Sequence, residues 1–207
     1  MKTKTIAMII AMVMIVVCMV SGTLAWLTDS TSEVKNTFST AGIDIELTET
    51  WNYDSNNDET NDSWKAQMIP GFSYAKDPKV TVKANSVDCY LFVKFEEKNS
   101  ASTYLTYTST LTVANGWTQG TGAGTGGNGV PTNVWFREVT SSPSDQSWDL
   151  LSGNTITVKG DAVTKDNITT AASAELVYTA YATQLYESAG SKFAVGTAWT
   201  NASTSGT

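Results

Sequence analysis

The acidic stretch WNYDSNNDETNDSWK, residues 51–65, holds the side chains best suited to binding a cation. Asp54, Asn56 and Asp58 have the spacing of the first three ligands of an EF-hand loop. The glycine and the bidentate glutamate that complete such a loop are replaced by Glu59 and Lys65, which excludes an EF-hand. A low-affinity calcium site in this exposed loop remains open, with a solvated charge cluster as the alternative.

Aromatic residues suggest a second kind of site, in which their rings stack on the rings of sugars. The chain has seven tryptophans and eight tyrosines, and most of them lie in alternating segments where packing is the ordinary use of an aromatic ring. Trp51, Trp64 and Trp117 lie next to loops and are the three rings that we would test as a glycan platform. Core packing is the alternative for each of them.

Histidine is absent from the sequence, which removes the residue that most hydrolytic sites use. Ser-His-Asp and Cys-His triads and the HExxH zinc site are therefore excluded. A glycosidase with two carboxylates stays open, although no pair of acids stands out. Gly122, Gly124 and Gly127 match G-x-G-x-x-G, but the run leads into a predicted strand and not a helix, so the match is compositional. We expect no enzymatic activity.

Charge and cysteine usage restrict the partners further. The net charge is −7, with 13 Lys and Arg against 20 Asp and Glu, which predicts no nucleic-acid binding and repulsion from anionic lipid. Cys89 is the only cysteine after residue 25, so that part of the chain has no internal disulfide. It lies in the strand-prone run DCYLFVKF, which favours a small buried hydrophobic residue over a reactive thiol.

The first 25 residues have the composition of a signal peptide. Lys2 and Lys4 precede an apolar run at 6–20, and small or polar residues follow up to Ala25. The 15-residue run is shorter than the roughly 20 residues that cross a bilayer. We expect cleavage between Ala25 and Trp26 and an extracellular protein. The alternative is an uncleaved anchor extended through Leu27, which would be the one contact with a membrane.

Period-two alternation, which is typical of β-strands, dominates the rest of the chain. It occurs in GIDIELTE, KVTVKA, DCYLFVKFEE, YLTYTSTLTV, NVWFREV, NTITVKG, ELVYTAYATQ and FAVGTAW. Convincing helical periodicity is missing, and only residues 161–173 suit a short helix or turn. The glycine-rich run 115–129 is predicted to be an exposed and very flexible loop.

These patterns predict an all-β fold, a single jelly-roll-like antiparallel β-sandwich of about eight or nine strands. We place the sandwich at residues 43–200, an N-terminal segment at 26–42 and a disordered tail at 201–207.

The sequence that follows the apolar run carries a family resemblance. SGTLAWLTDSTSEVKNTFSTAGIDIELTE resembles the start of the TasA/camelysin family, Gram-positive proteins exported with the dedicated signal peptidase SipW. The matching positions are Gly22, Thr23, Ala25, Trp26, Leu27, Asp29, Asn36, Thr37, Phe38 and Gly42. A second similar stretch, MIPGFSYAKDPKVTVKANSVDCYLFVKF, matches through Pro70, Gly71, Lys76, Asp77 and Pro78, and VYTAYATQ is similar to the closing strand.

The resemblance implies an exported jelly-roll-like domain that assembles into fibres of the biofilm matrix. In such fibres the N-terminal segment of one subunit adds as a strand to the sheet of the next. The implied partners are a SipW-type signal peptidase during export and other copies of the same chain. Some camelysins are described as metallopeptidases, and the absence of histidine argues against that activity here.

Strand donation also follows from physical reasoning. An open sheet edge offers unpaired N–H and C=O groups that an incoming strand satisfies. The donated segment would be Leu27–Phe38, with Leu27, Val34 and Phe38 as its apolar residues, because its alternation is too weak to commit it to its own sheet. Head-to-tail pairing of this kind does not close and generates filaments. The alternatives are the first strand of the chain's own sheet and a disordered leader.

We therefore expect a secreted structural protein, a subunit of a biofilm-matrix fibre that uses no cofactor, with calcium in the acidic loop left open. The alternative is a cell-surface module that binds glycan or calcium, and a camelysin-like peptidase is the remote alternative.

Overall fold

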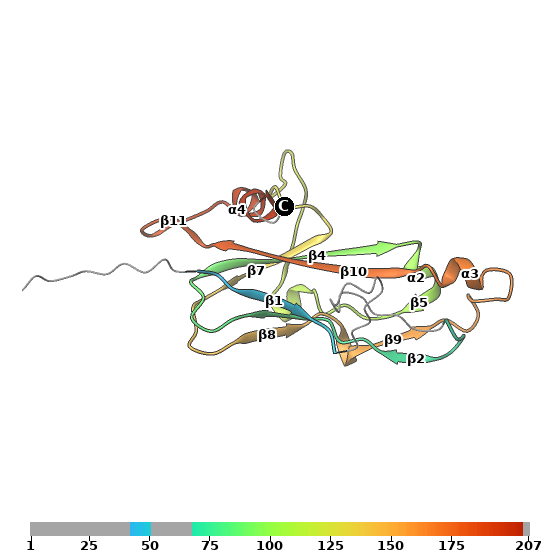
Figure 1. Ribbon diagram of the computed structural model, residues 1–207. Helices are drawn as coiled ribbons and strands as arrows, with labels where there is room; N and C mark the ends of the chain where they lie inside the picture. Colours follow the sequence, from blue (N-terminus) through green and yellow to red (C-terminus); the bar gives the residue numbers. More distant parts are fainter. Residues whose placement is uncertain (1–41, 51–67, 205–207) are drawn as a thin grey trace, which may run out of the picture. The chain divides into compact units, whose positions relative to one another are not determined.

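The computed structural model describes residues 42–50 and 68–204 (Figure 1). This part of the chain consists mostly of antiparallel strands with few helices, which confirms the all-β prediction. Six of the eight predicted strands are present in the structure: β1 (Ile45–Thr48), β3 (Lys79–Val82), β4 (Cys89–Lys98), β7 (Val134–Val139), β9 (Thr155–Val158) and β10 (Glu175–Gln184).

The largest sheet is built around β4, with the strand order β10-β4-β7-β6, where β6 is Thr118–Gln119. β4 begins with five buried residues, as expected for a strand rich in aromatic and branched side chains that is covered on both faces. All ten residues of β4 pair with β10, from Glu175 opposite Lys98 to Gln184 opposite Cys89.

Two further sheets contain the remaining long-range pairings. One has the order β1-β3-β8, with β8 at Gln146–Asp149. The other has the order β2-β9-β5, with β2 at Ser73–Ala75 and β5 at Leu105–Thr106. The hairpin of β11 (Tyr186–Ser188) and β12 (Ser191–Lys192) follows β10.

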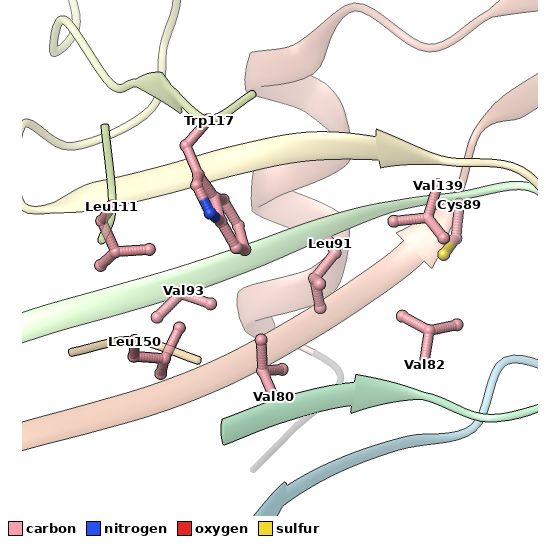
Figure 2. Close-up of a cluster of buried hydrophobic side chains, with 9 residues drawn as sticks. All are labelled: Val80, Val82, Cys89, Leu91, Val93, Leu111, Trp117, Val139 and Leu150. Carbon is pink, nitrogen blue, oxygen red and sulfur yellow. The ribbon is translucent and has the colours of Figure 1, made fainter. Parts of the chain in front are cut away.

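The inner core lies between the β4 sheet and the β3 sheet (Figure 2). Val80 and Val82 of β3 meet Leu91 and Val93 of β4 in one cluster of buried side chains. These residues come from alternate positions of their strands, so the faces that the sequence pattern predicted to be apolar face each other. The complete cluster is Val80, Val82, Cys89, Leu91, Val93, Leu111, Trp117, Val139 and Leu150.

The outer face of the β4 sheet is covered by the C-terminal helix α4 (Val195–Thr204). The Trp199 ring packs edge-on against Phe92 and Tyr181, with ring centroids 5.4 and 5.2 Å apart. The prediction of a strand at FAVGTAW was therefore wrong, and so was the prediction of disorder at residues 201–204. The apolar residues at 195, 198, 199 and 202 follow the spacing of a helix face, a periodicity that the strand prediction overlooked.

The threonine-rich run YLTYTSTLTV is not the long strand that its alternation predicted. Only Leu105–Thr106 is a strand, while the helix α2 (Ala101–Tyr104) precedes it and the 3-10 helix η1 (Val113–Asn115) ends the run. The Ser109 hydroxyl accepts from Leu111 N at 3.1 Å, and local side-chain bonds of this kind compete with a regular ladder. Of the short helix or turn expected within 161–173, the structure shows the helix α3 (Ile168–Ala171), and a second 3-10 turn, η2, spans Ser152–Asn154.

The glycine-rich run 115–129 is mostly exposed, as predicted, and its backbone forms defined hydrogen bonds. Gly122 N donates to Val130 O at 2.7 Å, and Gly129 N donates back to Gly122 O at 2.9 Å. The Asn128 side chain accepts from the backbone N–H groups of Thr121 and Val130 at 3.0 and 3.1 Å. The run therefore closes on itself through defined hydrogen bonds.

Gly120 lies where this run leaves β6, and we expect Gly120→Ala to lower the free energy of unfolding by about 1–3 kcal/mol or more. An added Cβ would lie 2.0 Å from the backbone oxygen of Pro131, so the strand connection must shift. Chemical denaturation measures the effect. Gly42→Ala is the matched control, because its Cβ would meet nothing within 4 Å, and an equal loss in both variants would contradict the explanation.

Candidate functional site

β10 presents an unpaired edge. Partners in an antiparallel ladder alternate between residues that exchange hydrogen bonds and residues that do not. Leu185 N donates to Asp88 O at 2.9 Å, which places the bonded positions of β10 at odd residue numbers. The backbone N–H and C=O groups of the even-numbered residues therefore point away from β4; these are Leu176, Tyr178, Ala180, Ala182 and Gln184. Within the described ranges, no strand pairs with this side of β10.

The opposite side of β4 supports this assignment. Phe95 N donates to Asn133 O at 2.9 Å, so the odd residues of β4 bond β7 and its even residues bond β10. Both observations give one consistent alternation across the sheet.

In the part of the chain that the structure describes, β1 presents a second open edge next to the first. Lys83 N donates to Asp44 O at 2.9 Å, so the even residues of β1 bond β3 and the backbone groups of Ile45 and Leu47 point outward. β1 lies against β10, although the two strands belong to different sheets and are not paired with each other. We call these two edges together the open side.

The side chains at the open side are mostly apolar. Ile45, Tyr178 and Ala180 are half-buried and pack against the inner core, while Leu47 is 38 % exposed. An added strand would find both backbone partners and apolar contacts here, which is what strand addition requires.

The other lateral side of the core is closed. Arg137 of β7 lies over the rings of Trp148 and Trp117, with the guanidinium carbon 4.3 and 5.2 Å from the ring centroids. The two rings meet edge-on at 6.3 Å. Burial lowers the pKa of Arg137 from its ordinary value. Thr110 N donates to Leu150 O at 3.1 Å and so covers the end of β8. Aromatic packing and a covering segment thus seal the core between β7 and β8, while β8 is itself an edge strand with the backbone N–H of Ser147 directed outward.

Trp117 is part of this seal, which corrects its place in the predicted glycan platform. Its side chain is 2 % exposed, so no ring face is available for stacking on a sugar. The ring was assigned to a loop because glycines flank it, but the loop folds it into the core. Trp51 and Trp64, the other two residues of that hypothesis, lie outside the described residues.

A partly buried ion pair lies where β1 ends. Lys76 Nζ bonds both carboxylate oxygens of Glu49, at 2.9 and 3.1 Å, and Lys76 is 6 % exposed. Burial raises the pKa of Glu49, and the charge of Lys76 opposes that rise. Burial and then the negative charge of Glu49 raise the pKa of Tyr178, whose buried hydroxyl has no hydrogen-bond partner among the described residues. The ion pair ties the chain that follows β1 to the chain that follows β2.

Several predicted site residues lie outside the described residues. They are the cleavage residues Ala25 and Trp26, the donor residues Leu27, Val34 and Phe38, and the calcium-loop residues Asp54, Asn56 and Asp58. Among the described residues there is no cluster of three or more His, Cys, Asp or Glu side chains that suits a metal ion. The same residues include no helix that is long and apolar enough to span a membrane.

Cys89 behaves as the sequence predicted. Its side chain is fully buried in the inner core. Burial, assisted by the charge of Asp88, raises the pKa of the thiol to about 11, so the reactive thiolate is disfavoured at neutral pH.

The open side itself was not identified from the sequence. ELVYTAYATQ predicts a strand, but nothing in it says that one edge stays unpaired. The run contains no lysine or proline, the residues that commonly protect an edge strand, so no signal in it marks the edge.

Neither a protein-family model, nor a curated protein, nor a solved structure matches this chain.

Proposed function

We propose that this chain is a secreted structural protein, the subunit of an extracellular biofilm-matrix fibre in which copies join by donating an N-terminal strand. The open side formed by β1 and β10 is the observation that carries the proposal. The donated segment is Leu27–Phe38 of a second copy, freed when a SipW-type peptidase removes residues 1–25. We also propose that the sheets form a jelly-roll-like β-sandwich, which the donated strand completes.

The length of the segment suits the acceptor. Twelve residues at about 3.3 Å each extend over roughly 40 Å, enough to pair along all ten residues of β10. Val34 and Phe38 fall on one face of such a strand, where they can replace water over the apolar open side. Each outward-pointing N–H and C=O of β10 gains a partner in the same step.

The proposal predicts that Ala180→Pro abolishes fibre formation by the exported protein. Ala180 N–H points away from β4, so proline removes a donor that only an added strand uses and leaves the pairing with β4 intact. Electron microscopy and sedimentation of concentrated protein measure assembly, and circular dichroism confirms that the variant folds.

Ser147→Pro is the matched control on the closed side. Its N–H also points out of its sheet, and the variant loses only the 2.8 Å bond between the Ser147 and Thr81 hydroxyls, so it should assemble normally. A second test compares chains that start at Trp26 and near Gly42, of which only the longer should polymerise. Equal assembly of the two chains, or fibres from Ala180→Pro, would refute strand donation.

A further inference from the structure

Three large apolar side chains are exposed at one end of the strands. Ile69 is 43 % exposed, Phe72 is 52 % exposed and Ile168 is 42 % exposed. Ile69 and Phe72 flank the turn before β2, which Phe72 N closes on Ile69 O at 3.1 Å, and Ile168 begins α3 shortly before β10 (Figure 1). We call these three residues the end patch.

The opposite end of the strands is the one where β1 begins. Val87 N donates to Gly42 O at 3.3 Å, and Asn85 N donates to Ser142 O at 2.7 Å, which brings residues 84–88 and 140–145 together beside Gly42. We call this the Gly42 end. β10 runs from the end patch to the Gly42 end, because Glu175 follows α3 and Leu185 bonds Asp88.

The direction of a donated strand decides which ends meet. If the strand runs antiparallel to β10, its last residue, Phe38, lies beside Glu175, at the end patch. Only residues 39–41 then separate it from Gly42 of the donor, and four steps of at most about 3.6 Å span roughly 14 Å. The Gly42 end of the donor must therefore lie against the end patch of the acceptor.

The parallel direction gives a different assembly. Phe38 would then lie near Gln184, like ends would face each other, and two copies could exchange strands in a closed dimer. Every pairing in the β4 sheet is antiparallel, and an added strand continues that pattern most simply. The antiparallel direction brings unlike ends together, and such contacts repeat without closing.

We infer that the Gly42 end of each copy covers the end patch of the next copy, in a filament whose donated strand runs antiparallel to β10. The inference rests on the proposed function and adds to it a second interface and a polarity. The end patch is exposed in the single chain because its partner is another copy, and assembly removes its apolar surface from water.

The test measures the critical concentration of the exported protein by sedimentation. We expect Phe72→Ser to raise it by about tenfold, the effect of losing a half-exposed aromatic ring from an interface, and Ile69→Ser to raise it by a smaller factor. Val113→Ser is the matched control, since Val113 is 77 % exposed and lies in neither contact surface. It should leave the critical concentration unchanged. Unchanged values for both end-patch variants would overturn the inference.

Hydrogen exchange separates this inference from the proposed function. In wild-type filaments the amides of Tyr178, Ala180 and Ala182 should become protected, because the donated strand accepts from them. If these amides are protected but both end-patch variants assemble as the wild type does, only the contact at the end patch is refuted. If the amides are not protected, strand donation is refuted, and the inference that rests on it fails as well.

Cross-linking tests the polarity. Under mild oxidation, filaments mixed from Phe72→Cys and Pro143→Cys chains should form disulfide-linked pairs. Pro143→Cys alone should form none, and pairs from that variant alone would show that like ends meet, which overturns the antiparallel direction.

Discussion

Trp117→Ala is expected to lower the free energy of unfolding by about 3–5 kcal/mol, as for other buried aromatic residues. The ring is 2 % exposed and packs against Trp148 and the Arg137 guanidinium. Its removal leaves a cavity and admits water beside Arg137, whose buried Nε has no hydrogen-bond partner within the described structure. Urea denaturation followed by the fluorescence of the remaining tryptophans measures the loss.

Val113→Ala is the control for this substitution, because the residue lies in the same loop and is 77 % exposed. Its effect should stay within about 0.5 kcal/mol, as is usual for surface positions. A loss below about 1 kcal/mol for Trp117→Ala would show that the seal between β7 and β8 is not part of the core.

Lys76→Met is the substitution with the second large expected effect, a loss of about 3–5 kcal/mol at neutral pH. Methionine preserves the apolar stem, but Glu49 keeps its charge in a partly buried position without the ammonium that lies 2.9 Å away in the native chain. Lys79→Met is the control: its partner Asp149 is 3.4 Å away and both side chains are nearly half exposed, so about 0–1 kcal/mol is expected.

The pH dependence of Lys76→Met identifies the cause. Burial raises the pKa of Glu49, and without Lys76 the rise should be larger. A carboxyl with a raised folded-state pKa destabilises the fold above that pKa and ceases to do so once it is protonated. The deficit relative to the native chain should therefore shrink as the pH falls, and Lys76→Met with Glu49→Leu should recover much of it. A deficit that is constant with pH would point to lost packing instead.

The sequence predicted the strands that pack against the core and missed the elements defined by local bonding. β3, β4 and β10 combine alternation with branched and aromatic residues, and burial of one face fixes their register. The threonine-rich run has the same alternation, yet its Ser109 hydroxyl accepts from the backbone N–H of Leu111, and only two residues of the run form a strand. Alternation predicts a strand when the burial of apolar side chains supports it, and threonine side chains contribute little apolar burial.

Helix α4 shows a different limit of prediction from sequence. Val195, Ala198, Trp199 and Ala202 are compatible with a helix, while the short window FAVGTAW also reads as a strand. Packing of Trp199 on Phe92 and Tyr181 selects the helix, and such tertiary contacts are not visible in a seven-residue window.

The open side could not be predicted because an unpaired edge is a property of the strand order. Among the described residues, β4 has partner strands on both sides and β10 on one side only, although both were predicted as strands from their sequences. Only the bonded register shows that Tyr178 and Ala180 direct their backbone groups outward. The segment proposed to fill this side was recognisable from the sequence, whereas its acceptor required the three-dimensional arrangement.

The burial of Cys89 allows a cysteine introduced elsewhere to be labelled selectively in the folded chain. Its thiol is both inaccessible and protonated at neutral pH, so it should not react with maleimide while the chain is folded. The other cysteine, Cys18, belongs to the leader that we expect to be removed. A cysteine introduced at an exposed position can therefore carry a fluorescent label at a single site, and growth at each filament end can be followed by microscopy in an otherwise native chain.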